Sequence, residues 1–195
     1  MKALYWLLLL WSSLIPLNAN HYVISNAFLN QKSVDFVEKI SSELYEKTGV
    51  RLYIVSVDSL QAEGKQEREK FKTSILKDLN KPYGVIFFIK SHKKIDIVLN
   101  PKIDSINSDT IITEYMVPIL MQDKKLSNPA ISASILNGYA QLAEEIANHF
   151  HQELPENIIV DKSGAKNFVH YTFLTMLGMM FLLVIGVYVF GRKKR

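Results

Sequence analysis

Residues 83–105, YGVIFFIKSHKKIDIVLNPKIDS, decide the fold of this chain. Positions 85–89 are all apolar, which is the pattern of a strand that is covered on both faces of its sheet. Ile95, Ile97 and Leu99 alternate with less uniformly apolar neighbours, which is typical of a strand nearer an edge. Because only the short polar segment 91–94 separates the two runs, we expect the two strands to pair antiparallel.

Segments with strand and helix patterns alternate upstream of this hairpin. Residues 21–25 and 51–57 have the composition of strands, and a helical pattern runs from Ser33 to Gly49. Ser33 is predicted to cap the start of that helix and Gly49 to end it. A second helix is predicted over 65–79, where apolar residues recur four apart.

Two further helices are predicted downstream of the hairpin. The first starts at Ser108 and should kink or end near Val117, because Pro118 cannot donate a helical hydrogen bond. In the second, Asn128 is predicted to be the cap and Pro129 to lie in the first turn, and the helix extends to about Phe150. Strands that alternate with helices in this order predict an α/β fold, a three-layer α/β/α sandwich with a small mixed β-sheet.

Both ends of the chain have the composition of targeting segments. Residues 1–19 read as a signal peptide, with Lys2 before a long apolar run and Ala19 at a suitable cleavage position. The alternative is that this segment is retained as an uncleaved anchor. Residues 168–190 lack charged side chains and, at about 1.5 Å per residue, are long enough to span a bilayer.

The basic tail 191–195 predicts the orientation of that C-terminal transmembrane helix. Positively charged residues next to a membrane span stay on the cytoplasmic side. Residues 20–150 are therefore expected to form a periplasmic or otherwise extracytoplasmic domain, joined to the span by a polar tether over 151–167. This arrangement, together with the absence of cysteine, favours a single-pass protein of the bacterial inner (cell) membrane.

Charge and cysteine content exclude several functional classes. Five of the 23 basic residues, Lys2 and the run 192–195, belong to the targeting ends, and the other 18 are balanced by all 19 acidic residues. The central domain is thus close to neutral, which does not favour nucleic acid as a partner. With no cysteine, the chain has no disulfide, zinc–thiolate site or cysteine nucleophile.

The sequence contains no motif of the common nucleophilic or phosphate-binding types. It lacks a G-x-S-x-G elbow, a G-x-x-x-x-G-K loop and a G-x-G-x-x-G turn. Glu145 and His149 are four residues apart and would share one side of a helix, whereas His151 would lie on another side. An acid–histidine pair near a helix end is more typical of a solvated face than of a metal site.

Asp104 and Asp109 are the candidate metal ligands. They flank the turn that follows Leu99, and Asn100 and Asn107 lie close by in the sequence. Oxygen-bearing side chains gathered at the carboxyl edge of a sheet suit Ca²⁺ or Mg²⁺. The alternative is structural, because an aspartate at the start of a helix also satisfies free backbone N–H groups and complements the helix dipole.

Four segments of the chain resemble the TPM domain family: NAFLNQKSVDFVEKISSELYEKTGVRLYIVSV, YGVIFFI, KKIDIVLN and SDTIITEYMVPIL. The resemblance covers about residues 22–150 and includes Leu29, the Thr48-Gly49 pair, Gly84 and the segment 109–118. It implies an α/β/α sandwich and two roles. Some members are described as phosphatases or bind calcium, and others maintain or assemble membrane complexes.

The chain departs from the family pattern where the family carries acids and glycines. Pro82-Tyr83 stands where an acidic pair is common, and Asn100-Pro101-Lys102 stands where a Gly-x-Gly turn is common. Ser25 occupies a position that is often aspartate. Since fewer carboxylates lower the affinity of a cation site, we expect Asp104 and Asp109 to bind a cation weakly at best.

Two functional hypotheses follow. The first is a membrane-anchored interaction module that binds a membrane protein and serves the assembly, maintenance or quality control of a membrane complex, with no cofactor required. The second is a phosphatase acting on phosphomonoesters, in which Asp104 and Asp109 hold Ca²⁺ or Mg²⁺. A scaffold built through the membrane helix ranks below both, because Gly178 and Gly186 do not form a G-x-x-x-G motif.

Overall fold

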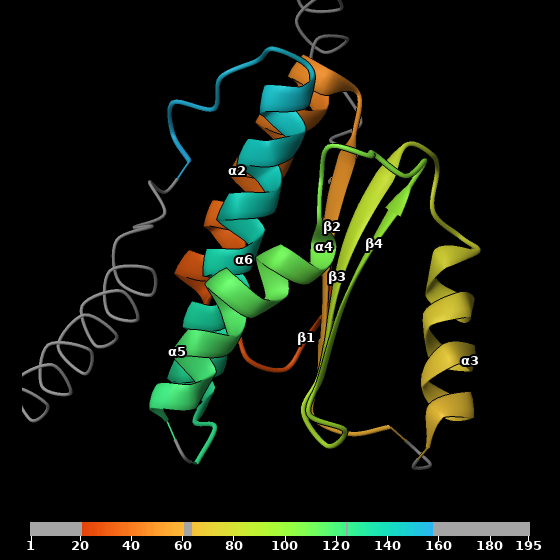
Figure 1. The fold of residues 1–195 in the computed structure, drawn as a ribbon, viewed down its shortest axis with the longest axis vertical. Helices are drawn as coiled ribbons and strands as arrows, with labels where there is room; N and C mark the ends of the chain where they lie inside the picture. The colour runs from red at the N-terminus through yellow and green to blue at the C-terminus, as the bar shows by residue number, and fades with distance from the viewer. Residues whose placement is uncertain (1–20, 61–63, 124, 158–195) are drawn as a thin grey trace, which may run out of the picture.

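The computed structural model describes residues 21–60, 64–123 and 125–157, which form an α/β fold around a four-stranded mixed sheet (Figure 1). The strands lie in the order β1-β2-β3-β4. The first three are parallel, and β4 is antiparallel to β3. Their bounds are β1 Val23–Asn26, β2 Arg51–Val57, β3 Tyr83–Ile89 and β4 Lys94–Asn100.

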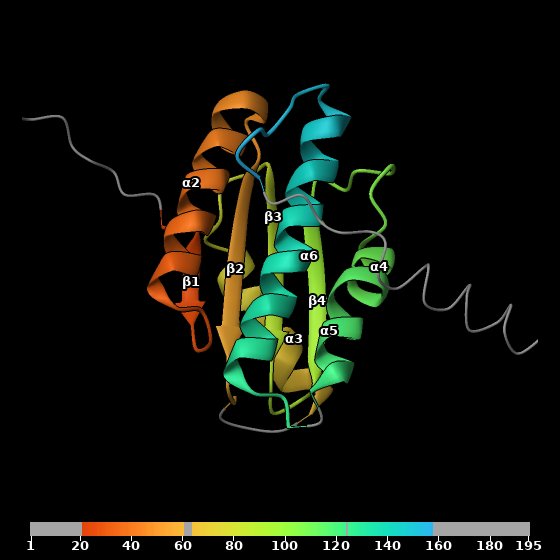
Figure 2. The ribbon, with the colours of Figure 1, turned by 90° about the vertical axis from the view of Figure 1, so that its left-hand side faces the viewer.

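Helices cover both faces of the sheet (Figures 1 and 2). On one face lie α2, α6 and the shorter helical segments between β4 and α6, and α3 lies on the other. The helical bounds are α2 Gln31–Thr48, α3 Lys65–Leu76, α4 Ser108–Thr110, η1 Ile111–Met116, α5 Val117–Gln122 and α6 Asn128–His149. The predicted α/β sheet with its antiparallel hairpin is thus confirmed.

Strand β3 lies in the core between the two helical layers. All seven of its residues are buried. Phe87 faces α3, where its ring lies edge-on to Phe71 at 6.4 Å between centroids. Phe88 points to the opposite face and contacts Phe28 at 5.7 Å. Because both faces are covered, every residue of β3 is apolar or glycine, as the sequence pattern predicted.

The start of α2 differs from its prediction. Asn30 caps the helix, since its side-chain oxygen accepts the backbone N–H of Ser33 at 3.0 Å. Ser33 is instead a buried residue of the first turn. Asn and Ser are both good caps, so composition alone did not identify which one occupied the position. Gly49 ends the helix in the left-handed conformation at φ 73°, as predicted.

Pro118 explains the irregular helix between β4 and α6. Proline has no N–H to donate to the carbonyl four residues earlier, and here a π-helical segment ends at Met116 and α5 begins at Val117. Side chains of α6 hydrogen-bond to backbone carbonyls at the end of this segment: Ser134 donates to the Met116 carbonyl and Asn137 to that of Tyr115. The interruption near Val117 was predicted, but the π-helical form was not.

The long helix α6 begins at Asn128, and Ser127 is its flanking residue, one position before the predicted cap. After α6, residues 151–157 lie against the domain rather than extending from it. Leu154 is buried, Asn157 donates to the Ala140 carbonyl at 2.9 Å, and Lys47 donates to the Glu153 carbonyl. No helix among the described residues is long and apolar enough to cross a membrane. The predicted signal peptide and the predicted span over 168–190 lie outside those residues.

Candidate functional site

The loop that follows β4 lies at the edge of the sheet where β2 and β3 begin. Asn100 at the end of β4 pairs with Tyr83, which in turn pairs with Arg51. The prediction that this loop lies at the carboxyl edge was therefore wrong. β4 runs antiparallel to β3, so its carboxyl end meets the amino ends of the parallel strands.

Buried residues hold this loop in place. Ile103 and Ile106 are buried, and the Ile106 N–H donates to the Ile103 carbonyl at 3.0 Å, which closes a turn. Asn100 donates from its amide nitrogen to the Tyr83 hydroxyl at 3.3 Å. The peptide bonds before Pro82 and Pro101 are both cis. The buried isoleucines and the Asn100–Tyr83 hydrogen bond fix the loop to the sheet edge, while its charged side chains remain at the surface.

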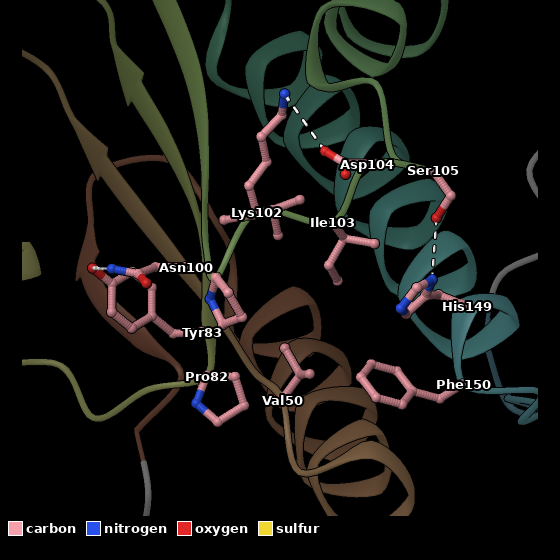
Figure 3. Close-up of a pocket in the computed structure, with 12 residues that line it drawn as sticks. Val50, Pro82, Tyr83, Asn100, Lys102, Ile103, Asp104, Ser105, His149 and Phe150 are labelled. Carbon is pink, nitrogen blue, oxygen red and sulfur yellow. Dashed lines mark hydrogen bonds and ion pairs between the residues drawn. The ribbon is translucent and has the colours of Figure 1, made fainter.

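A cavity of about 320 Å³ opens between this loop, the turn before β2 and the end of α6 (Figure 3). Most of its lining is apolar: Val50, Pro82, Tyr83, Leu99, Pro101, Ile103 and Phe150. Five polar or charged side chains, from the end of β4, the loop and α6, also contribute to it: Asn100, Lys102, Asp104, Ser105 and His149. The lining favours an apolar group as the occupant, with polar groups available to orient it.

Ser105 and His149 form the closest polar pair at this cavity. The Ser105 hydroxyl lies 3.2 Å from Nδ1 of His149, and Phe150 packs edge-on against the imidazole (Figure 3). Glu145, one turn earlier on α6, accepts a hydrogen bond from Gln141 at 2.8 Å. Among the described residues, no carboxylate is hydrogen-bonded to His149. The pair therefore lacks the third group that would orient the imidazole as the base of a nucleophilic serine.

Asp104 and Asp109 line a second groove of about 520 Å³ on the other side of the loop. Asp104 is 97% exposed, and its Oδ1 lies 3.8 Å from the ammonium nitrogen of Lys102. Asp109 is exposed in the first turn of α4, where the Asn107 side chain accepts the N–H groups of Asp109 and Thr110. The two aspartates thus reach one groove, but Lys102 lines it too and opposes a bound cation.

The described residues contain no group of three or more His, Asp or Glu side chains that could hold a metal ion. Two exposed carboxylates alone would coordinate Ca²⁺ or Mg²⁺ weakly, because ligand number and charge set the affinity. The residues at this edge therefore fit a permanent metal site poorly.

Sequence reasoning missed several residues of the cavity. Ser105 and His149 are 44 positions apart, and their contact exists only because α6 ends beside the loop. Val50 and Phe150 carry no local signal of function, since each reads as an ordinary residue at the end of a helix or strand. The departures at Pro82 and Pro101 were the one sequence signal that pointed to this place.

Comparison with known proteins gave one family and a set of similar folds. The model of the TPM domain matches residues 23–144. The solution NMR structure of the N-terminal domain of a protein from P. gingivalis has a TM-score of 0.56 and 9% sequence identity, covering 71% of this chain and 89% of that chain. The NMR structure of the BA42 protein from the psychrophilic bacterium Bizionia argentinensis has a TM-score of 0.44 and 14% identity, covering 68% and 95%. A search of curated proteins found no match.

Proposed function

Because the chain belongs to the TPM domain family, we propose that its domain is an interaction module that binds a membrane protein outside the cytoplasm. In this proposal the apolar segment 168–190 anchors the protein in the bacterial inner membrane, with the domain on the periplasmic side. The module would serve the assembly, maintenance or quality control of a membrane protein complex.

The apolar cavity at the loop edge is the observation that supports this role. Pro82 and Pro101 line it at positions where the family resemblance led us to expect acids and glycines, and Ile103 and Phe150 add further apolar surface. A pocket of this kind suits an apolar side chain of a partner, and burying one such side chain contributes about 1.5–3 kcal/mol. Lys102 and Asp104 lie at the rim and would orient the polar flanks of the partner segment.

Site-specific photocrosslinking of the full chain in its native membranes tests this proposal. A photoreactive residue at Asp104 is expected to capture a membrane protein, because this side chain is exposed beside the cavity. The matched position is Ser74, which is exposed on α3 at the opposite face of the sheet. Phe150→Ala removes one wall of the cavity and should weaken capture about tenfold, equivalent to about 1.4 kcal/mol.

Equal capture from Asp104 and Ser74 would contradict the proposal, since contact would then not depend on the cavity. A chain that keeps only the N-terminal segment and residues 158–195 serves as a second control. Any protein that it captures equally well binds the membrane segment rather than the domain. Thermal unfolding of Phe150→Ala separates a lost contact from a lost fold.

A second candidate function is a cation-dependent phosphatase, favoured by the presence of Asp104 and Asp109 in one groove. A cation held by these carboxylates would polarise a phosphoryl oxygen of a phosphomonoester. The candidate fits less well, because both side chains are exposed and Lys102 lines the same groove.

Asp109→Asn tests the phosphatase candidate. If that function is correct, millimolar Ca²⁺ or Mg²⁺ raises the melting temperature of the full chain in detergent and supports hydrolysis of p-nitrophenyl phosphate. Both effects should disappear in Asp109→Asn and persist in Asp78→Asn, which removes an exposed carboxylate elsewhere. The interaction module predicts no cation response in any of the three proteins. Hydrolysis that survives Asp109→Asn would identify a contaminant.

A further inference from the structure

A second groove lies at the opposite end of the sheet from the candidate site. Strand β3 joins the two regions, since Tyr83 lines the cavity and Phe88 lines the groove. At about 3.3 Å per residue, these two positions of the strand are about 15–20 Å apart. The groove has a volume of about 350 Å³ and lies between the β3–β4 hairpin and α5. Its main apolar residues are Phe88, Ile95, Ile112, Leu120, Met121 and Leu126.

The helix interruption at Pro118 lies beside this groove, because Val117 and Leu120 of α5 line it. Helix α5 restarts at Val117 and lies beside the lower part of β4 in Figure 2, with Met121 near its end. Met121 is 77% exposed, more than any other large apolar side chain of the described residues. A single exposed apolar side chain is ordinary, but Met121 lies in a groove with other apolar residues, and a contiguous apolar patch is the feature that marks interaction surfaces.

Three lysines of the hairpin line the same groove. Lys90 forms a salt bridge with Asp58 at 3.2 Å. Lys93 and Lys94 are exposed and take part in none of the salt bridges found among the described residues. Asp123, the acidic residue at the end of α5, is already bonded to Ser127. The groove therefore combines an apolar floor with two lysines that form no salt bridge among the described residues.

We propose that this groove docks the domain onto an anionic lipid surface, with Lys93 and Lys94 at the headgroups and Met121 in the interfacial region. Exposed apolar side chains flanked by lysines are the residue types that bind such surfaces. Each lysine near an anionic leaflet strengthens binding about fivefold, and salt screens this attraction.

The length of the chain outside the described residues favours a lipid occupant. Ten residues, 158–167, separate Asn157 from the apolar segment 168–190. They span at most about 35 Å, so a domain anchored by that segment stays close to the lipid surface. Docking through the groove would direct the cavity at Pro82 and Phe150 away from the surface, toward the parts of a membrane protein that project from it. Docking on lipid rests on the anchoring part of the proposed function, but it does not require a partner at that cavity.

Fluorescence from a single labelled position tests the proposal. The chain has no cysteine, so Met121→Cys gives one site for an environment-sensitive dye. The labelled full chain is placed in nanodiscs of phosphatidylcholine alone or with 30% phosphatidylglycerol. We expect a blue-shifted emission and an intensity at least threefold higher in the anionic discs, reversed by 0.5 M NaCl. The same dye at Lys102→Cys, at the other end of the sheet, should not respond.

Charge reversal tests the role of the lysines. Lys93→Glu with Lys94→Glu should abolish the response at position 121, whereas Lys77→Glu with Lys81→Glu, an equal change at exposed positions elsewhere, should preserve it. Far-ultraviolet circular dichroism establishes that both variants are folded. Equal emission in neutral and anionic discs would overturn the proposal. So would a dye at 121 that responds only when a membrane protein is added, since the groove would then bind protein.

Discussion

Replacement of Gly138 by alanine is expected to destabilise the domain by about 1–2 kcal/mol, although alanine is the better helix former. Gly138 lies within α6 where that helix crosses η1. A Cβ atom at this position would lie 2.4 Å from Cγ and 2.5 Å from Sδ of Met116. Met116 is fully buried, so its side chain has little room to move aside. Overpacking costs about 1–3 kcal/mol and exceeds the gain of about 1 kcal/mol in helix propensity.

A double-mutant cycle with Met116→Ala measures this contact by urea unfolding. Met116→Ala alone should cost about 2–5 kcal/mol, because it leaves a cavity in the core. In the double variant the alanine methyl group at 138 enters that space, so the combined cost should fall below the sum by at least about 1 kcal/mol. Asn148→Ala, at an exposed position of the same helix, should change stability by less than about 0.5 kcal/mol. Additive costs in the cycle would show that the two residues do not compete for space.

The central hairpin and its neighbours could be predicted because their signals are local. Strand β2 has the predicted bounds 51–57, and β3 is buried on both faces as its uninterrupted apolar run indicated. Gly49 ends α2 because a left-handed residue is needed there, and glycine adopts that conformation without strain. Each of these features depends on residues within a few positions in the sequence.

The candidate site depends on tertiary arrangement, which local patterns do not encode. The hairpin was correctly predicted as antiparallel, but its consequence for the loop after Asn100 was missed, so Asp104 and Asp109 were assigned to the wrong edge. The cavity also needs the end of α6, since Phe150 forms one wall. The π-helical segment was missed for a related reason. Pro118 predicts that the helix is interrupted, but not that the interruption is π-helical. The π-helical segment packs against α6, a separate helix that the local pattern around Pro118 does not include.

The two ends of the sheet carry different chemistry, and this difference links the two proposals. The edge with Pro82 and Phe150 offers a mostly apolar cavity suited to one side chain. The end with Met121, Lys93 and Lys94 offers an open apolar groove with positive charge. A domain that docks on lipid through the groove would present the cavity to a membrane protein. Crosslinking at Asp104 tests the cavity, and fluorescence at position 121 tests the groove, so each proposal can fail without the other.

A buried hydroxyl pair between α2 and α6 leads to the last prediction. The Tyr139 hydroxyl lies 2.7 Å from the Ser41 hydroxyl and donates to the Val37 carbonyl at 3.1 Å, while Ser41 donates to the Leu52 carbonyl at 2.7 Å. The two hydroxyl groups thus have two protons for three close contacts: with the Val37 carbonyl, with the Leu52 carbonyl and with each other. Tyr139→Phe leaves the Ser41 proton satisfied, so at pH 8 it should cost only about 1 kcal/mol.

At alkaline pH, the stability advantage of the parent protein over Tyr139→Phe should disappear or reverse. Burial raises the pKa of Tyr139 above its ordinary value, so the folded state keeps the phenol neutral. The stabilisation is fully present below the unfolded-state pKa of about 10 and is lost as the pH rises above it, by about 1.4 kcal/mol at pH 11. Phenylalanine does not titrate, so urea unfolding at pH 11 should find the variant at least as stable as the parent. Ser41→Ala retains the phenol and should keep the full alkaline loss. If Tyr139→Phe loses as much stability as the parent between pH 8 and pH 11, Tyr139 does not cause the alkaline loss.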